Sequence, residues 1–160
     1  MDWHSRISRS FASLTVGMAL CVACPGHAAA QDPYAMVTRG TRILEHGTGL
    51  RIKVLVEAAN LGGAEVDIGE ITFPAGSAPT SGHVHAAIEI FYILSGQLDH
   101  IVNGESHLLD PGMVGIVRPG DEVIHRVASD HPVKALVIWA PGGEVERIAR
   151  FFQQRPIDKD

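Results

Sequence analysis

Hydrophobic residues alternate with polar ones over most of this chain, which is the pattern of half-buried β-strands. Ile52, Val54 and Val56 alternate with Arg51 and Lys53, so one face of an extended segment is apolar. Similar runs, rich in valine, isoleucine and aromatic residues, predict further strands within residues 66–73, 88–94, 98–109, 113–117, 123–128 and 133–140. The chain is therefore expected to consist mainly of short strands.

Turn residues separate the predicted strands. Asn103 and Gly104 lie between two alternating runs and predict a two-residue hairpin turn, because both residues tolerate a positive φ. Gly96, Pro119 and Gly120 mark further turns. Many short strands joined by such turns are typical of an antiparallel sandwich or barrel. The mouth of a small barrel can hold one ligand.

One segment departs from the strand pattern. Within residues 143–154, the apolar Val145, Ile148 and Phe152 fall on one face of a helix. We expect a short amphipathic helix that lies against the outside of the barrel. The predicted fold class is thus all-β with a short C-terminal helix.

The first thirty residues have the composition of a cleavable export signal. A short basic segment precedes an apolar stretch at residues 11–23 that is too short to span a membrane. Ala28 and Ala30 form a small-residue cleavage pattern. We expect a signal peptide at residues 1–30 and a single domain at residues 31–160, located in the periplasm or secreted.

Both cysteines, Cys21 and Cys24, lie in this predicted signal. The mature domain would then have no thiol for catalysis, metal ligation or a disulfide. Lipid attachment at Cys24 is an alternative interpretation, although no bulky aliphatic residue stands three positions upstream. Acidic residues outnumber basic ones, 18 to 13, and there is no basic run, so we expect no nucleic-acid partner and no attraction to an anionic membrane surface.

Candidate metal ligands occur in the stretch HVHAAIEIFYILSG, residues 83–96. On a strand, His83 and His85 point the same way about 6.6 Å apart, so their imidazoles can share one ion. Glu89 has the same parity but would lie roughly 13 Å beyond His85 on a straight strand. The chain must therefore bend after His85, where two alanines permit it. Taken singly, each residue is also compatible with a core or surface role.

Two histidines and a carboxylate suit one divalent transition metal, either iron, manganese, nickel, copper or zinc. The stretch resembles the first motif of the cupin superfamily, H-x-H-x(3,4)-E-x(6)-G, in His83, His85, Glu89 and Gly96. The stretch VRPGDEVIHRVAS resembles the second motif in Pro119, Gly120 and His125. The resemblance implies a jelly-roll barrel in which four residues bind the metal, namely His83, His85, Glu89 and His125.

The second motif departs from the family pattern. The segment from Pro119 to His125 is one residue longer than usual, and Ser129 stands where asparagine is common. A three-ligand site that lacks His125 is therefore an alternative. With either set, open positions on the ion permit a small molecule or dioxygen to bind.

The resemblance implies several activities for a metal site of this kind. We expect a metal-dependent enzyme of the cupin dioxygenase type that acts on a small organic substrate. A non-catalytic module that binds a small ligand, and a metal-dependent isomerase or lyase, are the alternatives. The module could form a homodimer through the C-terminal helix or a sheet face.

Other polar and aromatic residues have expected places around the site. Glu70 is the candidate general acid or base, and Phe91 and Ile93 are expected to line the barrel and exclude water. His100 and His107 should face each other across the predicted hairpin, and we expect them to form a surface pair. Trp139 is expected to be a core or rim aromatic, with a platform for the substrate as its alternative role.

Overall fold

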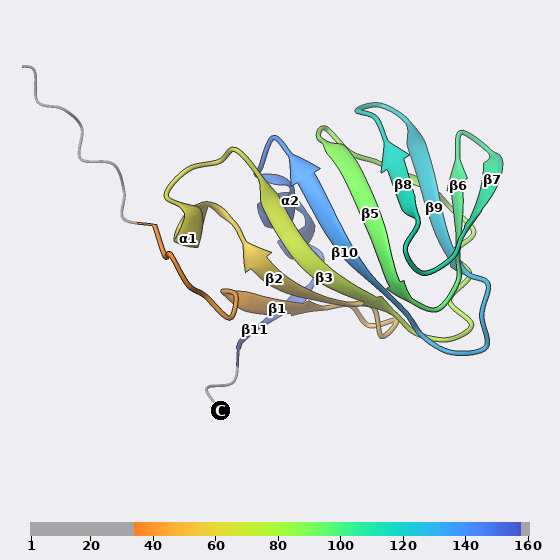
Figure 1. Ribbon diagram of the computed structural model, residues 1–160, viewed down its shortest axis with the longest axis horizontal. Helices are drawn as coiled ribbons and strands as arrows, with labels where there is room; N and C mark the ends of the chain where they lie inside the picture. Colours follow the sequence, from red (N-terminus) through yellow and green to blue (C-terminus); the bar gives the residue numbers. More distant parts are fainter. Residues whose placement is uncertain (1–33, 158–160) are drawn as a thin grey trace, which may run out of the picture. The chain divides into compact units, whose positions relative to one another are not determined.

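The computed structural model describes residues 34–157, which contain eleven strands and two short helices. The strands are β1 (Arg42–Glu45), β2 (Arg51–Val56), β3 (Asp67–Phe73), β4 (His83–Val84), β5 (Ile88–Ser95), β6 (Leu98–Val102), β7 (Glu105–Leu109), β8 (Val114–Val117), β9 (Glu122–Val127), β10 (Val133–Ala140) and β11 (Gln153–Pro156). The helices are α1 (Ala58–Leu61) and α2 (Glu144–Ala149). Figure 1 shows how these elements are arranged.

The strands form two antiparallel sheets. One has seven strands in the order β11-β1-β2-β3-β10-β5-β8, and the other has four in the order β4-β9-β6-β7. This arrangement, which can be followed in Figure 1, confirms the predicted jelly-roll of the all-β class. Alternate side chains of both sheets point inward and form one apolar core, which includes Leu44, Phe73, Phe91, Leu98 and Val137.

The hairpin at Asn103 and Gly104 is confirmed. Their φ angles are 51° and 83°, and β6 pairs with β7 on either side of the turn, with His100 opposite His107. Asn103 also accepts a hydrogen bond from the backbone N–H of Glu122. The turn residues therefore set the register of the four-stranded sheet.

The bend predicted after His85 is confirmed, and its cause is a change of sheet. β4 ends at Val84 and belongs to the four-stranded sheet, whereas β5 begins at Ile88 in the seven-stranded sheet. Ala87 is buried in the core at this crossing, where a larger side chain would need space that the packed interior does not offer. The crossing carries the chain from one wall of the barrel to the other.

The C-terminal segment differs from the single helix expected at residues 143–154. α2 ends at Ala149, and β11 follows and pairs with β1. Pairing gives the backbone of β1 hydrogen-bond partners on a side that would otherwise be open, which outweighs the helical pattern. The short C-terminal helix itself is confirmed, and its Val145, which is 1% exposed, packs into the core as expected for the apolar face of an amphipathic helix.

The sequence pattern missed four short elements, namely α1, β1, β4 and β11. In residues 34–157, no helix has the length and apolar character needed to cross a membrane. The predicted signal peptide, including the two cysteines, lies outside the described residues.

Candidate metal centre

Three of the expected ligands meet at the crossing between the two sheets. His83 comes from β4, His85 lies just after it, and Glu89 is on β5. The ligand atoms of these three side chains all lie within 4.8 Å of one another. His85 and Glu89 are buried and His83 is exposed, so the group is sealed on one side and reachable from the other.

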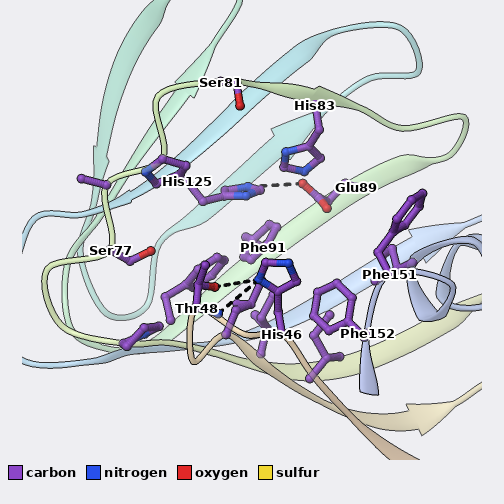
Figure 2. Close-up of a pocket in the computed structure, with 18 of the residues that line it drawn as sticks. His46, Thr48, Ser77, Ser81, His83, Glu89, Phe91, His125, Phe151 and Phe152 are labelled. Atoms are coloured by element: carbon purple, nitrogen blue, oxygen red, sulfur yellow. Dashed lines mark hydrogen bonds and ion pairs between the residues drawn. The ribbon is translucent and has the colours of Figure 1, made fainter. Parts of the chain in front are cut away.

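His125 comes to the same place from β9. Its Nε2 lies 3.4 Å from Oε1 of Glu89, and its ring centroid lies 5.4 Å from that of His83. Figure 2 shows the rings of His83 and His125 both close to the Glu89 carboxylate. β4 pairs with β9, and the backbone N–H of Gly120 donates to the carbonyl of His85 at 3.2 Å. The structure thus brings the second motif against the first despite its extra residue.

The chemistry of this cluster fits a metal ion. Three of its buried polar atoms make no hydrogen bond, namely Nε2 of His85, Oε1 of Glu89 and Nε2 of His125. Buried polar atoms are nearly always paired, and leaving them unpaired is costly. A cation held between imidazole nitrogens and a carboxylate would satisfy all three, and this donor set suits a transition metal.

Two neighbouring side chains fix the orientation of these ligands. Nδ1 of His85 lies 2.7 Å from Oε1 of Glu144 on α2, and the indole N–H of Trp139 donates to Oε2 of Glu89 at 2.8 Å. Sequence reasoning missed Glu144, because nothing in its local pattern separates it from the exposed Glu146 of the same helix. Trp139 is a core aromatic, which was one of its two expected roles, and it also holds the candidate ligand Glu89.

Charge in the cluster is set by burial and by these contacts. Burial opposes ionisation of Glu89, but the close imidazoles of His125 and His85 outweigh it and hold the pKa of Glu89 well below its usual range. Burial likewise tends to lower the pKa of His85, but Glu89 and Glu144 raise it overall. Desolvation, together with the charges of His125 and His85, lowers the pKa of His83 to about 4. His83 is therefore neutral at pH 7 and has a lone pair to offer, although part of the residue is exposed.

The prediction of a surface pair at His100 and His107 was wrong for His100. His100 is 2% exposed, and its ring lies 5.2 Å from that of His125 and 5.9 Å from that of Phe91. It is paired in register with the buried His125 of β9 and is covered by strands on both sides, whereas His107 is on the edge strand β7 and is exposed. Both ring nitrogens of His100 are buried without a hydrogen bond.

The structure does not bring Glu70 to the cluster. Glu70 lies on β3 between Gly69 and Ile71, which are both buried, so its side chain leaves the opposite face of the sheet. Its carboxylate pairs with Nζ of Lys134 at 3.2 Å on the neighbouring strand β10. This placement gives no support to Glu70 as a general acid or base.

A cavity of about 710 Å³ opens onto the cluster. His83, His85, Glu89 and His125 all line it, with Trp139. Its other walls are mostly apolar and are formed by Leu50, Ile52, Ile71, Phe73, Phe91, Ile148, Phe151 and Phe152. Phe91 thus lines the barrel as expected, whereas Ile93 is buried in the core and is not among the lining residues.

The far end of the cavity is bordered by aromatic side chains from opposite ends of the domain. His46, in the loop between β1 and β2, has its ring centroid 5.2 Å from that of Phe152. Figure 2 shows the two rings close together, with Phe151 beside them. Nδ1 of His46 is hydrogen-bonded to the hydroxyl of Thr48 at 2.9 Å. The cavity therefore suits an organic molecule with a substantial apolar part.

Comparison with known proteins agrees with this geometry. Residues 69–139 match the model of the cupin domain family. No curated protein gives a significant sequence match. An RmlC-like cupin from Shewanella frigidimarina NCIMB 400 has a TM-score of 0.55 and 20% identity, with 69% of this chain and 92% of that chain covered.

Two further solved structures are similar. KdgF from Halomonas sp. has a TM-score of 0.53 at 18% identity and covers 62% of this chain and 84% of its own. The TT1209 protein from Thermus thermophilus has a TM-score of 0.50 at 25% identity, with coverages of 57% and 83%. Residues 69–139 of this chain thus match the cupin domain family, and these solved structures share its fold.

Removal of a ligand side chain is expected to abolish most metal binding. Loss of a supporting hydrogen bond typically weakens metal affinity by about 10- to 100-fold. The affinity for Zn²⁺ or Co²⁺ should fall by more than this in His83→Ala, His85→Ala and Glu89→Ala, because each change removes a direct bond to the ion. His125→Ala should do the same for a four-ligand site and should have little effect for a three-ligand site. Metal content by mass spectrometry and affinity by chelator competition measure this.

The control for these variants is His107→Ala, which changes an exposed histidine on β7. His100→Ala is a poorer control, because its ring contacts that of His125. Equal metal content in the parent protein and in the His83→Ala, His85→Ala double variant would contradict the assignment of the cluster as a metal site.

Proposed function

We propose that this protein is a metal-dependent enzyme of the dioxygenase type that acts on a small, largely apolar organic molecule. One observation carries the proposal: the unpaired buried atoms of His85, Glu89 and His125 converge at the wall of an apolar cavity of about 710 Å³. A site that only stabilised the fold would be closed by protein ligands. Here the ligands face a space large enough for a substrate.

The residues around the cluster have separable roles in this proposal. His83, His85, Glu89 and His125 would hold the ion, and Trp139 keeps Glu89 in place through its indole N–H. Phe73 and Phe91 line the cavity next to the ring of His125 and would exclude water from the substrate. A bound iron, manganese, nickel or copper ion would supply Lewis acidity and a redox couple, and zinc would supply Lewis acidity alone.

The polar residues of the cavity favour this chemistry over isomerisation or a lyase reaction. Beyond the metal cluster, the lining residues with a polar side chain are His46, Thr48, Ser77, Ser81, Trp139 and Arg147. Among them, His46 is the only residue of a type that commonly acts as a general acid or base, and its ring lies against Phe152 at the far end of the cavity from the cluster. Isomerases and lyases that work by proton transfer need a general acid or base positioned next to the substrate, whereas oxidation relies on the bound metal ion. Non-catalytic ligand binding by the same cavity is the second candidate function.

Oxygen consumption tests this assignment. Metal-loaded protein, offered a panel of phenolic and other aromatic compounds, should consume dioxygen with at least one of them. Consumption should fall to background after chelation and in the His83→Ala, His85→Ala double variant. A compound that binds the metal-loaded protein tightly, without oxygen consumption or any change in the compound, would instead favour the non-catalytic function. Conversion of that compound to an isomer would favour the isomerase.

We also propose that the protein is exported and that residues 1–30 are removed. The support is the order of basic residues, apolar stretch and small residues that ends at Ala28 and Ala30.

Export predicts a defined N-terminus. The protein recovered from the periplasm or the medium should begin at Gln31, as measured by N-terminal sequencing or intact mass. Ala28→Leu together with Ala30→Leu should block cleavage, because large residues do not fit the small-residue pattern. Recovery of a chain that retains an acylated Cys24 would contradict the proposal and support the lipoprotein.

For the quaternary structure, we propose a homodimer formed through the outer face of β5 and β8. The outward side chains there include Ile88, Tyr92, Leu94, Val114 and Ile116, and all five are exposed. β8 is the edge strand of the seven-stranded sheet. These five positions carry no charge, so the surface that matches them best is the same apolar patch on a second copy, related by a twofold axis.

The dimer can be tested by light scattering on the purified mature protein. The parent protein should have the mass of two chains, and Ile116→Lys should shift it toward one, because the charge would be buried in the interface. Leu108→Lys is the matched control, since Leu108 is also exposed but lies on β7 in the other sheet. A monomeric parent at micromolar concentration would rule the dimer out.

A further inference from the structure

The helix α2 lies outside the stretch that matches the cupin domain family, yet it reaches the candidate metal centre. The family match ends at residue 139, and α2 runs from Glu144 to Ala149. Glu144 is 4% exposed, which is unusual for a glutamate. Its carboxylate meets Nδ1 of His85 at 2.7 Å and accepts hydrogen bonds from the guanidinium of Arg147.

We propose that Glu144 is a positioning residue that holds His85 in the tautomer required for metal binding. This inference rests on the proposed metal site. A carboxylate can only accept a hydrogen bond, so Nδ1 of His85 must be the donor. Nε2 lies 2.9 Å from Oε2 of Glu89 inside the cluster, and a bound ion would take its lone pair there while Nδ1 keeps the proton that it donates to Glu144. Glu144 therefore determines which nitrogen of His85 is offered to the ion.

The surroundings of Nδ1 make this choice depend on Glu144. Nη2 of Arg147 lies 3.3 Å from the same nitrogen, and a guanidinium can only donate. Without the carboxylate, Arg147 would be the remaining polar partner of Nδ1. It would favour the tautomer with the proton on Nε2, which cannot bind a metal through that atom. The loss of Glu144 should thus do more than remove one hydrogen bond.

The position of Glu144 is itself fixed by the start of α2. Oδ2 of Asp67, which is 2% exposed, accepts the backbone N–H groups of Gly143 at 2.8 Å and Val145 at 2.9 Å. These two bonds hold the residues on either side of Glu144. Arg147 also donates to the carbonyl of Val84, next to His85. The first turn of α2 is thereby joined to the segment that carries His83 and His85.

The test compares metal affinity in the full mature protein. Glu144→Ala should weaken the affinity for Zn²⁺, measured by competition with a chelator, by about 10- to 100-fold. Glu144→Gln retains an acceptor oxygen and should bind more tightly than Glu144→Ala. Glu146→Ala is the matched control on the same helix, since Glu146 pairs with Arg42 rather than with the cluster, and its affinity should equal that of the parent.

A second measurement separates positioning from a purely structural role. In zinc-loaded protein, NMR spectra of the His85 ring should show a slowly exchanging proton on Nδ1 in the parent and a rapidly exchanging one in Glu144→Ala, because the hydrogen bond to Glu144 protects it. Unchanged affinity in Glu144→Ala, or weaker affinity with unchanged exchange of the Nδ1 proton, would overturn the inference. A parent protein that binds no Zn²⁺ or Co²⁺ would instead overturn the proposed function.

Discussion

The passage of the chain from one sheet to the other between Val84 and Ile88 is the constraint on which the candidate site depends. On a straight strand, His85 and Glu89 would lie too far apart to share an ion. The crossing brings Nε2 of His85 to 2.9 Å from Oε2 of Glu89. It also places the pair where β9 closes the barrel, so His125 can approach from the opposite wall.

The cluster is an unfavourable arrangement for the apoprotein. Three buried polar atoms without hydrogen bonds cost stability that a well-packed apolar core would not lose. Trp139 is hydrogen-bonded to Glu89 and Glu144 to His85, and these contacts hold the two side chains in this arrangement. The site is therefore held ready for a ligand at the expense of the fold, as is common for preorganised functional sites.

Periodicity and turn residues predicted most of the strands, the hairpin at Asn103 and the bend after His85. They failed where the signal is short or nonlocal. β4 has two residues, and β11 forms because β1 supplies a partner from the other end of the domain. His100 could have been placed inside by its register with His125, but that register depends on which strands pair. Glu144 was missed because only the tertiary fold brings it to His85, 59 residues earlier in the chain.

The residues that line the cavity come from two parts of the chain. All four candidate ligands lie within residues 69–139, the stretch matched by the family model. Much of the wall away from them comes from outside that stretch, from Leu50 and Ile52 and from Ile148 to Phe152. Substitutions in these flanking segments can alter the shape of the cavity without touching the ligand set. Related chains could therefore diverge in the molecules they accept while keeping the same reactive centre.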